Sequence, residues 1–193
     1  MSGYVAAAHD RMIAGLIIPC SVVGVDLAGG AVRVSDGAGW TSAWVRWHSQ
    51  AAGKARHWRA PSLGEQGALI SPSGEPAQGT FVPGLYGNAG AQPDNRDHVE
   101  VWRFDDGGSL IYDWQAKSYS INLPSGTVTI QVGGSSAVVT DDSIAGKAST
   151  ILLAGEITLE GNVQIVGALS VAGDINGGGR IVDTAGNTAN HKH

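Results

Sequence analysis

The chain of 193 residues is poor in cysteine, in long apolar runs and, after its middle, in aromatic side chains. Its single cysteine, Cys20, excludes a disulfide within the chain and is compatible with assembly in a reducing compartment. No stretch reaches the roughly 18 consecutive apolar residues that a membrane helix requires, and the N-terminus lacks the basic start and apolar run of a secretion signal. We therefore expect a protein that is made soluble.

Charge and composition narrow the class further. The formal net charge of −5 argues against a purely electrostatic nucleic-acid binder, and a trimer would carry three times that charge. The 29 glycines predict a turn-rich β protein. Every Trp, Phe and Tyr lies at or before Tyr119, so two architectures share the chain.

The region after Tyr119 contains a glycine repeat. Glycine recurs at every sixth position from Gly155 to Gly179. Aliphatic residues keep a fixed phase between these glycines: Ile157, Leu159, Val163, Ile165, Leu169, Val171 and Ile175. An apolar face of period two, interrupted at intervals by glycine, is typical of extended strands and not of a helix.

This repeat has an apolar face but no interior of its own. Its backbone groups and its aliphatic side chains both need partners, and so thin a segment cannot close on itself. Three chains wound about one axis would supply both, with glycines at the bends. The alternative is a left-handed parallel β-helix of the hexapeptide-repeat type, which places one aliphatic residue in six where this chain has two. We expect a homotrimer with an intertwined triple-stranded β-helix over 99–172.

The first half predicts a short helix and a small barrel. Residues 4–16 carry apolar side chains at helical spacing, so residues 1–16 are interpreted as an N-terminal helix that either binds a partner or plugs the barrel. Within residues 17–87, five strands predict a closed barrel of the OB type. They are expected at 17–26, 31–35, 42–47, 66–71 and 79–85. The fold class is therefore all-β apart from this helix.

A linker and a hairpin follow the barrel. Residues 88–98 are rich in turn-forming residues and are interpreted as a linker. Residues 99–104 and 109–114 are expected to pair as a hairpin, because the four residues between them, Asp-Asp-Gly-Gly, favour a tight turn.

Two histidines close the chain, in an apex expected to span residues 173–193. In an extended strand His191 and His193 project to the same side. By itself such a pair is typical of a solvated tail or the remainder of a purification tag. On a threefold axis three chains would instead supply six imidazoles, which suit an octahedral ion better than tetrahedral zinc. We expect one iron ion per trimer, with nickel or another divalent ion as the alternative.

The barrel region also contains the best alternative function. Basic and aromatic residues alternate between 44 and 59, as in an OB-fold that binds single-stranded nucleic acid. The competing interpretation is that the tryptophans pack the barrel and the basic loop contacts another protein. No nucleophile–base pair or phosphate loop is recognisable, and Asp105–Asp106 and Asp141–Asp142 fit turns. We therefore expect no enzyme activity and no small-molecule substrate.

Several segments resemble the baseplate assembly protein V family, the central tail spikes of contractile-tailed phages and related particles. The resemblance is strongest over 44–58 (WVRWHSQAAGKARHW) and continues through 60–66, 71–74 and 82–86. Residues 101–112 are similar to the family's transition into the spike, and His191 to His193 resemble its metal-binding tip.

The resemblance implies a function and a set of partners. It implies an OB-fold collar attached to the tail hub in the baseplate, followed by a trimeric needle with an iron-binding apex. It also implies a location in the virion after assembly in the host cytoplasm, and mechanical passage through the outer membrane of a Gram-negative host when the sheath contracts.

Overall fold

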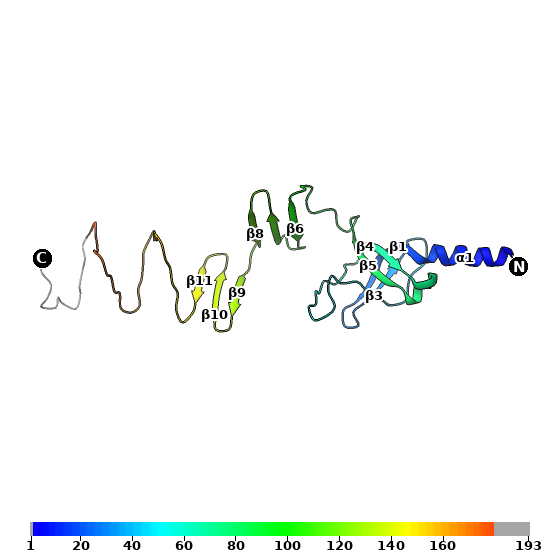
Figure 1. Cartoon of the computed structure of the whole chain (residues 1–193), viewed down its shortest axis with the longest axis horizontal. Coiled ribbons are helices and arrows are strands. Elements are labelled where there is room, and N and C mark those ends of the chain that lie inside the picture. Colours follow the sequence, from blue (N-terminus) through cyan, green and yellow to red (C-terminus); the bar gives the residue numbers. More distant parts are fainter. Residues whose placement is uncertain (1, 180–193) are drawn as a thin grey trace. The chain divides into compact units, whose positions relative to one another are not determined.

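The structure is a computed structural model that describes residues 2–179 (Figure 1). The chain divides after Gly126 into two units. The first holds a helix, a closed five-stranded barrel and a three-stranded sheet, and the second holds another three-stranded sheet followed by a segment without regular secondary structure. His191, His193 and the last part of the expected apex lie outside the described residues.

Helix α1 (Ser2–Leu16) leads directly into strand β1 (Ile17–Asp26). Its last turn rests on the loop after β4, where the Ser71 N–H donates to the Leu16 carbonyl at 2.8 Å. A side chain on Gly15 would come within 2.6 Å of the Gly74 carbonyl oxygen, so this contact requires glycine. The predicted helix is confirmed. No helix in the described part of the chain has the length and apolar character needed to cross a membrane.

The interpretation of this helix as a barrel plug is wrong. The close contact between Gly15 and Gly74 holds α1 against a loop on the outside of the barrel, and Figure 1 shows the helix leading away from the strands. Its apolar side chains consequently remain exposed, among them Tyr4, Val5, Met12, Ile13 and Leu16.

The barrel is formed by β1, β2 (Ala31–Ser35), β3 (Val45–Trp47), β4 (Gln66–Ile70) and β5 (Thr80–Leu85). It closes in the order β1-β2-β3-β5-β4, with β3 and β5 parallel and the other pairs antiparallel. The five predicted strands and their closure are confirmed. Strand β3 begins three residues later than predicted, and buried Ser42 bonds Val34 of β2 outside the ladder: its N–H donates to the Val34 carbonyl at 2.8 Å and its hydroxyl accepts the Val34 N–H at 3.0 Å.

Alternating residues of these strands fill the core. The buried apolar side chains are Cys20, Val22, Val32, Val34, Val45, Leu69 and Phe81. The period-two pattern of β1, β2 and β4 therefore places one face of each strand inside the barrel. Burial raises the pKa of the Cys20 thiol, which disfavours the reactive thiolate.

The first unit ends in an antiparallel sheet of β6 (Val99–Arg103), β7 (Ser109–Asp113) and β8 (Ser118–Asn122), in that spatial order. Strands β6 and β7 form the predicted hairpin. The preceding segment is attached to this sheet, because Arg96 bonds both Asp94 at 2.8 Å and Asp113 at 3.2 Å. Asp113 also accepts the Gln115 and Ala116 N–H groups.

The second unit begins with β9 (Val128–Val132), β10 (Ser135–Val139) and β11 (Ile144–Lys147), paired antiparallel in the order β11-β10-β9. Residues 148–179 form no strand ladder and are exposed throughout. Three glycines of the repeat have positive φ, Gly155, Gly161 and Gly167, as expected where an extended chain must bend. The expected triple-stranded β-helix stays a prediction, because it requires two further chains.

Gly67 of β4 offers a test of the barrel core. A methyl group there would lie 2.6 Å from the Phe81 ring and would collide with the Val82 carbonyl, whereas one at Gly53 would meet nothing within 4 Å. We predict that Gly67→Ala destabilises the barrel by about 1–3 kcal/mol through overpacking and that Gly53→Ala leaves its stability nearly unchanged. Tryptophan fluorescence during thermal unfolding measures this, and equal melting temperatures for the two variants would contradict it.

Candidate functional site

The sheet β6–β8 has one face, rich in aromatic residues, that the described chain contacts only at Trp102, through the His57 ring. Its strand register brings Trp102, Leu110 and Ile121 into one row and Glu100, Tyr112 and Tyr119 into the next. Residues opposite one another in paired strands project to the same side, so both rows lie on one face. The exposed fraction is 42% for Trp102, 45% for Tyr112, 48% for Ile121 and 63% for Tyr119. This aromatic face is therefore a surface that lacks its partner.

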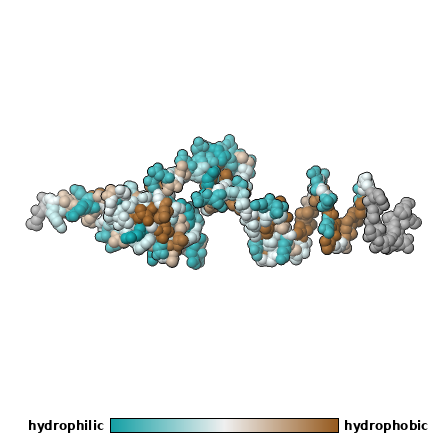
Figure 2. All heavy atoms as spheres, turned by 180° about the vertical axis from the view of Figure 1, so that it is seen from behind, coloured by the Kyte–Doolittle hydropathy of each residue, from teal (hydrophilic) through white to brown (hydrophobic). Residues whose placement is uncertain are grey.

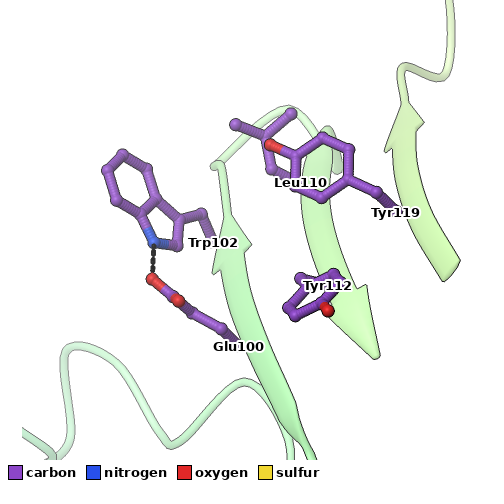
Figure 3. Close-up of a pocket in the computed structure, with 5 residues that line it drawn as sticks. All are labelled: Glu100, Trp102, Leu110, Tyr112 and Tyr119. Carbon is purple, nitrogen blue, oxygen red and sulfur yellow. Dashed lines mark hydrogen bonds between the residues drawn. The ribbon is translucent and has the colours of Figure 1, made fainter. Parts of the chain in front are cut away.

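Figure 3 shows the aromatic face at close range. Glu100, Trp102, Leu110, Tyr112 and Tyr119 line a shallow pocket, and the Trp102 indole N–H donates to the Glu100 carboxylate at 3.2 Å. The Tyr112 and Tyr119 rings lie 6.4 Å apart between centroids. His57, from the loop between β3 and β4, packs edge-on against Trp102 at 6.0 Å. Glu100 is the one charged residue in the two rows.

The opposite face of the same sheet has its polar groups paired within the chain. Asp113 is buried to 8% exposure and receives the hydrogen bonds of Arg96 and of the following turn. Beside it, Arg96 lowers the pKa of Asp94, and His98 lowers the pKa of Asp97 through a hydrogen bond. The same face carries Val99, Val101 and Ile111, which are half-buried, so it is more enclosed within the chain than the aromatic face.

The sheet β9–β11 repeats this asymmetry with aliphatic side chains. The register places Val128, Ile130, Val132, Val139 and Ile144 on one face. The other face carries Thr129, Gln131, Ser136 and Lys147. Ile144 is 83% exposed and Val132 79%, so the apolar face is open to water in the single chain.

The glycine repeat continues the pattern without strands. Every Ile, Leu and Val residue between 157 and 175 is at least 46% exposed. Figure 2 shows apolar residues crowded at the surface beside the grey C-terminal residues. Exposed apolar patches of this extent mark interaction surfaces in soluble proteins.

The basic and aromatic residues of the barrel form a second, smaller surface. Trp47 packs against the core and contacts the tilted Trp58 ring at 5.4 Å between centroids, while Trp58 is 65% exposed. The Arg33 guanidinium lies over the Trp44 ring at 5.7 Å. Trp47 therefore packs against the barrel core, whereas Trp44 and Trp58 lie at the surface.

Only part of the positive charge on this surface is neutralised. Arg59 pairs with Glu65 at 2.8 Å, and the same carboxylate accepts the Ser62 N–H. Lys54 and Arg56 lie in the exposed part of the loop and have no acidic partner in the described chain.

The acidic pairs considered for catalysis serve turns. Asp106 accepts the Gly108 N–H at 2.9 Å in the β6–β7 turn, and Asp142 accepts the Thr140 hydroxyl in the β10–β11 turn. Residues 2–179 contain no cluster of three His, Cys, Asp or Glu side chains that could hold a metal ion. The predicted ligands His191 and His193 lie beyond those residues, so the metal site stays a prediction.

Comparison with known proteins agrees with this two-part organisation. Residues 18–86 match the family described as the Type VI secretion system/phage-baseplate injector OB domain. Residues 100–177 match the family described as the Gp138 beta helical trimerization domain. The chain is also similar to the spike protein of Escherichia phage P2, with 27% identity over 95% of this chain and 89% of the P2 protein. The resemblance seen in the sequence is confirmed at the level of its parts: an injector OB domain is matched in the first half of the chain and a β-helical trimerization domain in the second.

Proposed function

We propose that this protein is the central spike of a contractile phage-type injection machine. Three identical chains form a needle that attaches to the tail hub in the baseplate and pierces the host outer membrane when the sheath contracts. One observation carries the proposal: a closed barrel is followed by sheets and repeats whose apolar faces are open in the single chain. The spike protein of phage P2, similar over nearly the whole chain, supports it.

The homotrimer follows from the need to cover these faces. Burying an aliphatic side chain stabilises an assembly by roughly 1.5–3 kcal/mol, and this chain presents such side chains from Val128 to Ile175. A threefold axis brings the same face of each chain inward and lets neighbouring backbones pair. The family match to a trimerization domain over 100–177 supports three chains as the number.

The barrel and the needle have different roles in the proposed machine. The barrel at residues 17–87, with α1 and the basic loop, attaches to hub proteins in the virion tail after assembly in the host cytoplasm. The needle transmits force. Small side chains and glycines keep it thin, and pairing between chains makes it stiff. This function needs neither an enzyme activity nor a small-molecule substrate.

The proposal also includes a metal site at the apex of the needle. His191 and His193 from three chains hold one octahedral ion, for which iron is favoured and nickel or another divalent ion is the alternative. Six imidazoles from two residues per chain match that coordination number. The ion joins three chain ends that would otherwise separate.

Native mass spectrometry tests the assembly. We predict a single species of three chains in neutral buffer, because the exposed apolar faces of residues 128–175 are covered only in an oligomer. A monomeric mass would contradict the proposed function as a whole.

Metal analysis tests the apex. We predict close to one ion per three chains in the purified protein, and loss of the ion when His191 and His193 are both replaced by alanine. The matched control is His9→Ala with His48→Ala, which removes two histidines elsewhere and should leave the metal content unchanged. Metal binding requires neutral imidazoles, so the ion should also be released as the pH falls below about 6. One ion per chain would refute a shared site.

Filter binding with single-stranded oligonucleotides tests the alternative function. The exposed Trp44 and Trp58, with Lys54 and Arg56 nearby, are the features that favour it. We predict no salt-sensitive binding at micromolar protein, because the chain as a whole is acidic. Binding that weakens steeply with salt and is lost in the double variant Lys54→Ala, Arg56→Ala would favour the nucleic-acid function instead.

A further inference from the structure

Glu100 is the exception on the aromatic face of β6–β8. It lies in a row with Tyr112 and Tyr119, beside a row that is wholly apolar. If three such faces meet, this carboxylate is enclosed with them. An enclosed carboxylate is strongly destabilising unless hydrogen-bond donors surround it, and in the single chain it has one, the Trp102 indole.

The order of the strands indicates where a second donor lies. Glu100 is on β6 and Tyr119 is on β8, and these are the two edge strands of the sheet. Their outer edges carry backbone groups that no described strand pairs, and such edges are normally covered in native proteins. In a ring of three identical sheets, the β8 edge of one chain adjoins the β6 edge of the next. The row Tyr119–Tyr112–Glu100 then continues from chain to chain.

We propose that the Glu100 carboxylate accepts a hydrogen bond from the Tyr119 hydroxyl of a neighbouring chain and thereby sets the register in which the three chains assemble. This inference rests on the proposed trimer and adds the contact that specifies it. The remaining apolar surface of the face, Trp102, Leu110 and Ile121, holds the chains together without choosing a register. A single buried polar residue specifies register and oligomeric state in coiled coils in the same way, because any shifted arrangement leaves it unpaired.

The partner on this face is another copy of the chain for two reasons. The trimerization-domain match begins at residue 100 and includes all three strands of the sheet. The tyrosine hydroxyls also balance the carboxylates: each chain contributes one acceptor at one edge and one donor at the other. Neither the Tyr112 nor the Tyr119 hydroxyl has a hydrogen-bond partner within the described residues.

Disulfide trapping in the full chain tests this contact. Glu100→Cys and Tyr119→Cys are combined, and the protein is oxidised and run on a non-reducing denaturing gel. Within one chain these positions are two strands apart, roughly 10 Å, which is too far for a disulfide. Adjoining edges of neighbouring chains lie within disulfide range, so most of the protein should run as covalent trimers. Wild-type protein, whose Cys20 is buried, is the reference.

The matched control moves one cysteine by one residue. Glu100→Cys with Ser120→Cys places the second thiol on the opposite face of β8, so it should give no covalent trimers. The Glu100→Cys, Tyr119→Cys protein could instead run as a monomer on the denaturing gel although native mass spectrometry shows the same sample to be trimeric. That result would overturn this inference and leave the spike proposal standing. A monomeric native mass of the wild-type protein would instead refute the trimer itself.

A second measurement avoids new cysteines. Glu100→Ala and Tyr119→Phe should each lower the guanidinium midpoint of trimer unfolding, and the double variant should lose clearly less than the sum of the two single losses, because both changes remove the same bond. Tyr86→Phe, an exposed tyrosine of the barrel, should leave the midpoint unchanged. Fully additive losses would show that the two residues do not interact and would overturn the inference.

Discussion

The structure depends on one constraint: beyond the barrel, the chain has apolar faces but no interior. In the barrel, five strands close on themselves, so each core side chain finds its neighbours within about seventy residues of the same chain. After β5 each sheet has three strands, two free edges and one uncovered apolar face. Such a sheet gains its stability from association, because burial of apolar area is the main favourable term available to it.

The sheet β6–β8 is the first element after the closed barrel that has an open face. Its Asp113 face is completed by the chain itself, through Arg96 and the turn that follows β7. Its aromatic face is left open. In the proposed trimer, the aromatic face would be the first surface along the chain that neighbouring copies cover.

Side-chain size falls along the chain in the same direction. Large aromatic residues occupy the open face of β6–β8, branched aliphatic residues that of β9–β11, and isolated Val, Ile and Leu residues alternate with glycine after residue 150. In the proposed trimer, smaller side chains facing the common axis would let the three chains lie closer together.

Much of the local structure was predictable from residue patterns. The helix, the five barrel strands and the β6–β7 hairpin were predicted because each depends on short-range periodicity or turn chemistry, such as the glycines after Asp106. Strands β10 and β11 lie within the β structure expected over 99–172, but their bounds were not predicted, since Ser135–Val139 and Ile144–Lys147 have weaker alternation. The attachment of Arg96 to Asp113 was also missed. The dense alternation of acidic and basic residues at 94–98 was a signal for it, but it did not identify the distant carboxylate.

The sequence by itself determined which residues need partners: its period-two faces, its glycine spacing and the confinement of aromatic residues to the first 119 positions follow from composition and order alone. Only the tertiary structure decided which of those residues find their partners within the same chain. It placed α1 outside the barrel, covered Asp113, and left Glu100 at one sheet edge and Tyr119 at the other. The physical reason is that strand register and order, which no local pattern encodes, determine which side chains share a face and which edges stay unpaired.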